Sequence, residues 1–160
     1  MNKKTLLASL CAGLAAAVVL SAPCAAAETT QQQAQPAAQQ PMRAPIPLSL
    51  SRVEKVLGTP NVYILDCNPQ DIYEKSHIKG AIHVDAEDWW KLLPKDKKNS
   101  YLIFYCINRL CNVSWEASLY AIQLGYENVF QMPDGIQGWV QNGYEFEGTG
   151  REDPGLADRY

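Results

Sequence analysis

Cysteine and histidine are scarce in the part of the sequence that is expected to fold. The chain has two histidines, and the cysteines outside the N-terminal segment are Cys67, Cys106 and Cys111. No two of these cysteines form a CxxC pair, and neither His77 nor His83 adjoins such a pair. Structural zinc sites in proteins usually show that spacing. The sequence therefore predicts no metal site and no cofactor.

Positive charge is also in short supply. The chain has 14 Lys and Arg against 17 Asp and Glu, a formal net charge of −3, and the basic residues form no stripe. Nucleic-acid-binding domains usually carry a basic patch or stripe, so nucleic acid is not an expected partner. An anionic substrate would have to be held by a local field and not by the charge of the whole molecule.

An apolar run long enough to suggest a membrane span is lacking too. Lys3 and Lys4 precede an apolar run over 6–20, and small residues end in Ala25-Ala26-Ala27. This pattern predicts a bacterial-type signal peptide over 1–27, with export and most simply a periplasmic location. The run is short for a bilayer span, so no stable span is expected after cleavage. An uncleaved anchor and a lipid-modified Cys24 are the alternatives, and Pro23 fits the second poorly.

Branched apolar residues are nearly absent from 28–47. This segment is rich in Gln, Ala and Pro, a composition that buries too little surface to offset its ordering entropy. We interpret it as a disordered linker. The folded domain is expected over 48–148, followed by a polar tail over 149–160.

From Leu48 onward the pattern alternates between helix and strand. Expected helices, in chain order, cover 51–58, 69–75, 86–93, 112–124 and 135–141. Expected strands cover 62–65, 81–84, 101–105 and 128–132. Ser51 to Glu54 match a capping box, and Val113, Ala117, Tyr120, Ala121 and Leu124 are expected to form one buried face. Strands that alternate with helices in this way predict an α/β domain with a largely parallel sheet.

The stretch from Tyr101 to Ala117 is the chemical centre of the chain. Five apolar or aromatic residues lead into Cys106, and a short loop with a second thiol, Cys111, leads into the best helical pattern. This arrangement puts a thiol at the carboxyl end of a buried strand, where parallel sheets place their ligand sites. The helix start adds free N–H groups and partial positive charge, which favour a thiolate. Cys106 is therefore the predicted nucleophile.

Three blocks of the sequence resemble the rhodanese-like domain family. They are Val62–Cys67 with Tyr73-Glu74 and His77–Ile82, then Phe104–Cys106 with the loop and helix after it, and Leu124–Phe130 with Asp134–Trp139. The resemblance runs from about Ser49 to Glu147, which is most of the mature chain. It implies a single domain with a parallel five-stranded sheet flanked by helices on both faces. Only four strands are evident, so the fifth is expected near Leu48 or in the tail.

The resemblance also implies an activity. Well-known members are sulfurtransferases, which implies that Cys106 takes a sulfane sulfur from a small sulfur-containing anion or a persulfide donor. The sulfur would then pass to a thiol or cyanide acceptor. The loop residues expected to bind the substrate are Ile107, Asn108, Arg109, Leu110 and Cys111.

The loop departs from the family pattern at two places. Arg109 stands where the family has a glycine, and Cys111 stands where it often has an arginine. Arg109 is then the expected cation of the site, with exposure to solvent as the alternative. The phosphatases that share this fold have a longer loop ending in arginine, and Asn112 holds that place here, which disfavours phosphate chemistry.

The extra thiols allow other readings. Cys106 could form a reversible disulfide with either Cys111 or Cys67, which would protect it from over-oxidation. The protein would then exchange thiols and disulfides, with a protein thiol as a candidate partner. A catalytically silent rhodanese-like module that binds a partner is the third reading.

Overall fold

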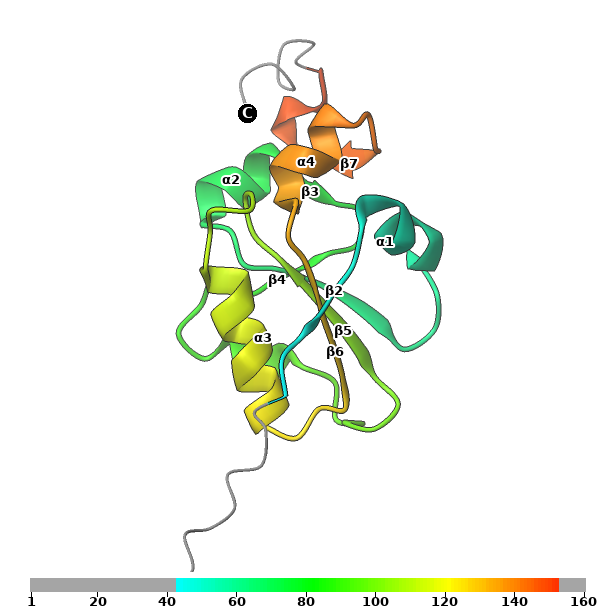
Figure 1. Ribbon diagram of the computed structural model, residues 1–160. Coiled ribbons are helices and arrows are strands. Elements are labelled where there is room, and N and C mark those ends of the chain that lie inside the picture. The colour runs from blue at the N-terminus through cyan, green and yellow to red at the C-terminus, as the bar shows by residue number, and fades with distance from the viewer. Residues whose placement is uncertain (1–42, 153–160) are drawn as a thin grey trace, which may run out of the picture. The chain divides into compact units, whose positions relative to one another are not determined.

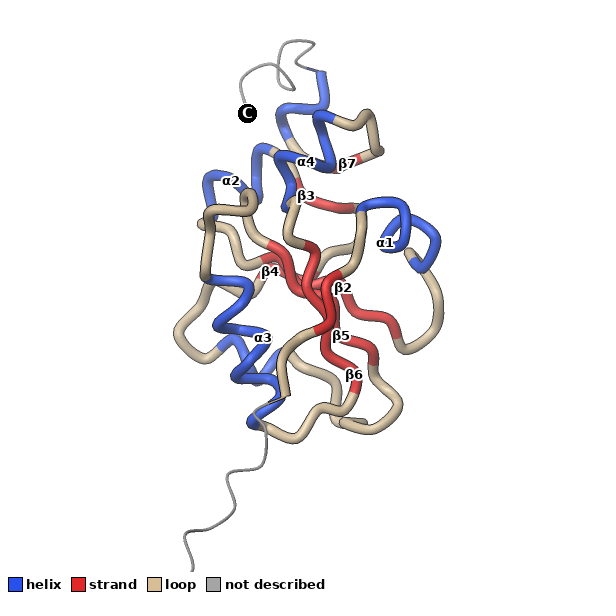
Figure 2. The backbone as a smooth tube through the Cα atoms, viewed as in Figure 1, coloured by secondary structure: helices blue, strands red, loops and turns tan. Residues whose placement is uncertain are grey.

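The computed structural model describes residues 43–152. The expected signal peptide, Cys24, the linker up to residue 42 and the tail from residue 153 lie outside the described residues. The described chain is an α/β domain built on a parallel five-stranded sheet (Figures 1 and 2).

The central sheet has the strand order β1-β6-β5-β2-β4, with every neighbouring pair parallel. Its strands are β1 (Ile46–Pro47), β2 (Val62–Asp66), β4 (Ile82–His83), β5 (Tyr101–Tyr105) and β6 (Asn128–Met132). A second, antiparallel pair joins β3 (His77–Ile78) to β7 (Phe146–Glu147). The middle strand β5 is buried from Leu102 to Tyr105, as its unbroken apolar run predicted.

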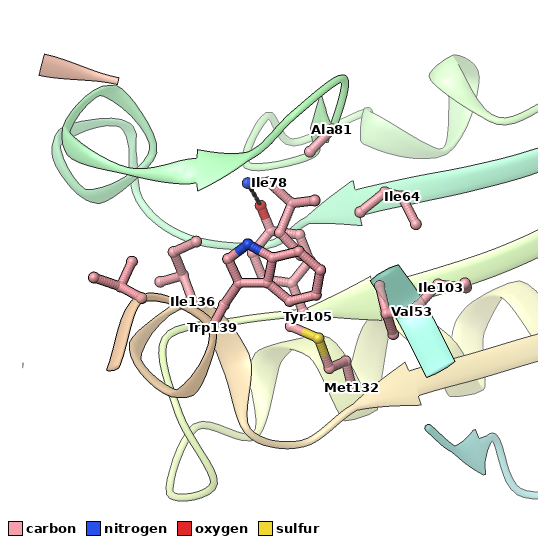
Figure 3. Close-up of a cluster of buried hydrophobic side chains, with 10 residues drawn as sticks. Val53, Ile64, Ile78, Ala81, Ile103, Tyr105, Met132, Ile136 and Trp139 are labelled. Carbon is pink, nitrogen blue, oxygen red and sulfur yellow. Dashed lines mark hydrogen bonds between the residues drawn. The ribbon is translucent and has the colours of Figure 1, made fainter. Parts of the chain in front are cut away.

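Helices cover both faces of the sheet. They are α1 (Leu50–Val56), α2 (Gln70–Lys75), α3 (Val113–Gln123) and α4 (Gly135–Gln141), with the short 3-10 helices η1 (Trp89–Leu92) and η2 (Thr149–Glu152). One apolar cluster joins α1 and α4 to the sheet (Figure 3). Ile72 of α2 packs against this cluster. The other cluster joins α3 and η1 to the opposite face. Within residues 43–152, no helix is both long and apolar enough to cross a bilayer.

The folded chain extends beyond both expected boundaries. The fifth strand is β1, which pairs with Phe130 and Gln131 of β6. It lies near Leu48, as expected, yet inside the segment interpreted as a linker. At the other end, η2 lies in the expected tail, and the Thr149 hydroxyl donates to the Glu74 carbonyl at 3.3 Å. The pairing of β1 with β6 and the contact of Thr149 with α2 place both segments in the fold, although their composition alone does not predict structure there.

Two expected helices differ in detail. The helix expected over 86–93 is reduced to η1. Helix α1 starts at Leu50 and has Ser49 as its N-cap, without a side-chain capping bond, so the capping box expected at Ser51 is wrong. In both cases tertiary packing sets the boundaries of a short helix more than its local pattern does.

The buried face of α3 is only partly the expected one: Ala117 and Ala121 are buried and Leu124 packs against the core, but Val113 and Tyr120 are not buried. Its buried residues are Ser114, Ala117, Ser118 and Ala121, whereas Val113 is 51% and Tyr120 38% exposed. The Ser118 hydroxyl donates to the Ser114 carbonyl at 2.6 Å, and Gln131 donates to the Ser114 hydroxyl at 3.1 Å. These bonds satisfy the buried hydroxyls, so small residues face the sheet, while Val113 and Tyr120 face outward.

Candidate active site

The site lies where β5 ends and α3 begins. Tyr105 ends the strand, Cys106 follows it at 3% exposure, and Asn112 is the N-cap of α3. Because all five strands of the sheet are parallel, their carboxyl ends share one edge, where open α/β sheets bind ligands. The predicted position of Cys106 therefore matches its position in the structure.

Cys106 and Cys111 are joined by a disulfide, with 6.3 Å between their Cα atoms. Of the two pairings considered from the sequence, the structure contains this one, and Cys67 is a free, buried thiol. Asp66 and Tyr105 are paired in register, so Cys67 and Cys106 leave neighbouring strands at the same edge. Burial, together with Asp66 and Asp85, raises the pKa of the Cys67 thiol far above its ordinary value.

Helix α4 holds the cysteine loop through hydrogen bonds. The amides of Ile136 and Gln137 donate to the carbonyls of Cys106 and Ile107, each at 2.9 Å. The Asn108 side chain donates to the Gln137 side-chain oxygen at 2.8 Å. Gly135, with φ of +63°, allows this approach, since a Cβ there would collide with both carbonyl groups. The loop and the start of α4 are thus one unit.

The loop also closes on itself through Asn108. The Asn108 side-chain oxygen accepts from the Leu110 amide at 3.0 Å, and its backbone carbonyl accepts from the Cys111 amide at 3.1 Å. Within residues 43–152, the amides of Ile107, Asn108 and Arg109 donate no hydrogen bond. Unpaired amides next to a sulfur atom can stabilise negative charge on it.

The loop achieves its turn without a left-handed residue. Asn61 is the single non-glycine residue with positive φ among residues 43–152. Arg109, at the place of the family's glycine, therefore has an ordinary negative φ. The right-then-left-handed backbone pattern that forms an anion-binding nest is absent from Cys106–Cys111.

Arg109 is paired away from the sulfur atoms. Its Nε donates to Asp134 Oδ1 at 2.7 Å, and its side chain is 69% exposed. The two residues line a shallow hollow of about 350 Å³ with Gln137 and Gln141. The expectation that Arg109 supplies the cation of the site is thus replaced by an exposed ion pair with Asp134. That partner follows β6 and has no local sequence signal connecting it to the loop.

A buried polar network lies beneath the same sheet edge. The Tyr105 hydroxyl donates to the Asp66 carboxylate. It accepts from the Ile78 amide at 3.0 Å (Figure 3). Asn68 donates to Asp66 from its backbone and its side chain at 2.8 and 2.7 Å. Burial raises the pKa of Asp66, and the bonds from Tyr105 and Asn68 oppose this rise. The network anchors the ends of β2 and β5, and no local pattern in the sequence predicts it.

Both histidines have structural roles. His77 stacks on Tyr73 and bonds the Tyr73 carbonyl through Nδ1 at 2.7 Å. His83 stacks on the same Tyr73 ring and bonds the Asn68 carbonyl through Nε2 at 2.7 Å. Among residues 43–152, no three His, Cys, Asp or Glu side chains gather as metal ligands.

Apolar side chains are exposed on the cysteine loop and at the start of α3. Leu110 is 90% exposed, and Trp89, Trp90, Val113 and Tyr120 line a hollow of about 430 Å³ beside the start of α3. A patch of this kind next to a reactive group is typical of a surface that receives a partner. In the sequence, the adjacent Trp89 and Trp90 are the feature that indicates this apolar patch.

Comparisons with known proteins agree with this architecture. The family described as Rhodanese-like domain matches residues 49–142. The thiosulfate sulfurtransferase GlpE of Tolumonas auensis is 23% identical over 92 residues, which are 58% of this chain and 85% of that protein. The tRNA uridine(34) hydroxylase of Photorhabdus laumondii is 27% identical over 96 residues, which are 56% of this chain. The chain spans only 26% of that hydroxylase.

Solved structures show the same fold. The BH2092 protein of Bacillus halodurans superposes with a TM-score of 0.58 at 26% identity, over 68% of this chain and 82% of that one. A thiosulfate sulfurtransferase from Pseudomonas aeruginosa superposes with a TM-score of 0.57 at 24% identity, over 71% of this chain and 21% of that one.

Proposed function

Because the chain belongs to the rhodanese-like domain family, we propose that it is a sulfurtransferase whose reduced Cys106 carries a sulfane sulfur as a persulfide. The observation that supports this most directly is the position of Cys106. It directly follows the central strand β5, precedes the N-terminus of α3 and adjoins three amides that are unpaired among the described residues. These groups favour negative charge on a thiolate and on a persulfide.

The proposed reaction has two displacements. The Cys106 thiolate attacks the sulfane sulfur of a donor such as thiosulfate, and the S–S bond of the donor breaks so that sulfite leaves with the electron pair. A thiol or cyanide then attacks the outer sulfur, and the Cys106 thiolate leaves. Covalent catalysis divides one difficult transfer into two easier steps. The disulfide to Cys111 is the resting oxidised form, which a reductant must open first.

The second candidate function is thiol–disulfide exchange. The Cys106–Cys111 disulfide supports it. The exposed Leu110 side chain and the hollow lined by Trp89 and Trp90 also support it. A protein thiol could dock on that surface and attack the disulfide. The signal-like sequence over 1–27 adds the proposal that the protein acts after export, most simply in the periplasm.

Trapping of the persulfide tests the first function. Reduced Cys111→Ser protein is incubated with thiosulfate, and its intact mass is measured, with Cys106→Ser as the control. We expect a gain of one sulfur atom that maps to Cys106 and is absent in the control. If neither thiosulfate nor a low-molecular-weight persulfide adds sulfur, while the oxidised wild-type protein still exchanges with dithiols, the second function is correct.

A further inference from the structure

We propose that Cys111 is the internal acceptor of the reaction, so that the Cys106 persulfide is resolved to the Cys106–Cys111 disulfide with release of hydrosulfide. This inference rests on the sulfurtransferase function proposed above. It changes the product: the protein would reduce sulfane sulfur to sulfide instead of passing it on intact.

The loop already contains the geometry of the product. The disulfide places Cys111 Sγ in bonding contact with Cys106 Sγ, the atom that forms the inner sulfur of a persulfide. The Cα separation of 6.3 Å lies within the range of about 4.4–6.8 Å found for disulfides. The loop's bonds through Asn108 and its contacts with α4 hold both cysteines near each other. No large rearrangement is therefore needed for the attack.

Atoms and electrons balance without an added oxidant. The Cys111 thiolate attacks Cys106 Sγ, a bond forms between the two Sγ atoms, and the bond to the terminal sulfur breaks. That sulfur leaves as hydrosulfide with the electron pair, after taking a proton from solvent. Sulfane sulfur is reduced, and the two cysteine thiols are oxidised to the disulfide. A dithiol reductant regenerates the thiols by exchange.

Three features favour this internal route over an external acceptor. Cys106 is 3% exposed, so an outside nucleophile must enter the loop, whereas Cys111 is already there at a high effective concentration. Arg109 faces Asp134 and not the sulfur atoms. The backbone lacks the left-handed residue of an anion nest, so the unpaired amides of the loop stabilise a persulfide anion less than a complete nest would. A thiol beside such a persulfide favours its prompt resolution.

Cys67 is the natural comparison. It follows the neighbouring strand β2 at the same edge, but it is buried and forms no disulfide within residues 43–152. Burial raises the pKa of its thiol, which disfavours the thiolate that attack requires. The replacement Cys67→Ser therefore serves as the matched control for Cys111→Ser.

A single-turnover experiment tests the inference. Wild-type, Cys111→Ser, Cys111→Ala and Cys67→Ser proteins are reduced, freed of reductant without oxygen, and mixed with one equivalent of thiosulfate. Sulfite, sulfide and intact mass are then measured. We expect wild-type and Cys67→Ser proteins to release sulfite and sulfide in equal amounts and to end as the disulfide. Both Cys111 variants should release sulfite, retain one added sulfur and release at least tenfold less sulfide.

The outcomes separate this inference from the function beneath it. If neither sulfite nor added sulfur appears in any variant, and a low-molecular-weight persulfide also adds no sulfur, the sulfurtransferase function itself is wrong. If the wild-type protein keeps its added sulfur, or if the Cys111 variants release sulfide as fast as wild type, the sulfurtransferase function stands and the role of Cys111 is overturned. Both Cys111→Ser and Cys111→Ala are used, so that a folding defect in one variant does not decide the result.

Discussion

Arg109 is the residue whose chemical type is least informative about its role. It provides positive charge within the cysteine loop, yet its Nε is bonded to Asp134 and most of its side chain is in solvent. An exposed pair of this kind contributes about 1 kcal/mol or less. Its effect on the sulfur atoms is therefore expected to be small.

The replacement Arg109→Ala is predicted to alter little. The free energy of unfolding should fall by about 1 kcal/mol or less, and the rate of sulfur uptake from thiosulfate should change by less than about fivefold. The measurements are urea unfolding and intact-mass kinetics in a Cys111→Ser background. Arg52→Ala, which removes the same charge from exposed α1, is the control. A far larger loss specific to Arg109 would mean that it turns toward the donor during the reaction.

Asp66 gives the fold a distinct pH dependence. Its pKa is raised above the model-compound value of 3.8 by burial. At pH values between the pKa of Asp66 in the unfolded chain and its raised pKa in the folded protein, the folded state binds more protons than the unfolded state. The contribution of Asp66 protonation to the free energy of unfolding is therefore complete at low pH and is lost as pH rises. We expect Asp66→Asn to gain stability relative to wild type as pH increases from about 4. Urea unfolding of both oxidised proteins from acidic to neutral pH measures this difference, and a constant difference would contradict it.

At the scale of elements, the sheet was predictable and its contacts to the loop were not. The continuous apolar run of β5 identifies a buried strand, and the helical pattern after Cys111 identifies α3. By contrast, β1 is two residues long and ends in a proline, so it has no pattern of its own. The pairing of Arg109 with Asp134 spans 25 residues and depends on the close approach of α4. Such long-range contacts leave no local signal in the sequence.

Gly135 is the residue on which that close approach depends. We predict that Gly135→Ala lowers the free energy of unfolding by about 1–3 kcal/mol, because its Cβ would meet the Cys106 and Ile107 carbonyls and would overpack the site. The shifted loop should also slow sulfide release. Gly143 is a matched control, since it has φ of +76° but no heavy atom within 4 Å of an added Cβ. Equal effects of the two replacements would show that backbone conformation alone, without the collision, matters at Gly135.

At the scale of the whole molecule, the proposed chemistry requires that both redox forms stay folded. The disulfide spans a sequence separation of only five residues, and for so short a loop the chain-entropy relation gives about 2 kcal/mol of stabilisation. Domains of this size are typically stable by about 5–15 kcal/mol. The two-sided core of the sheet does not involve the disulfide, so reduction should leave it intact.

We therefore predict that reduction lowers the free energy of unfolding by about 2 kcal/mol and leaves the protein cooperatively folded. Urea unfolding followed by tryptophan fluorescence, with and without reductant, measures this, because Trp139 is buried in one face of the core and Trp89 packs against the other. Cys67→Ser protein controls for disulfide exchange during unfolding. A reduced protein that is already unfolded in the absence of urea would contradict the prediction. In that case the loop could not hold Cys111 beside Cys106, and a cycle through the free thiols would be excluded on structural grounds.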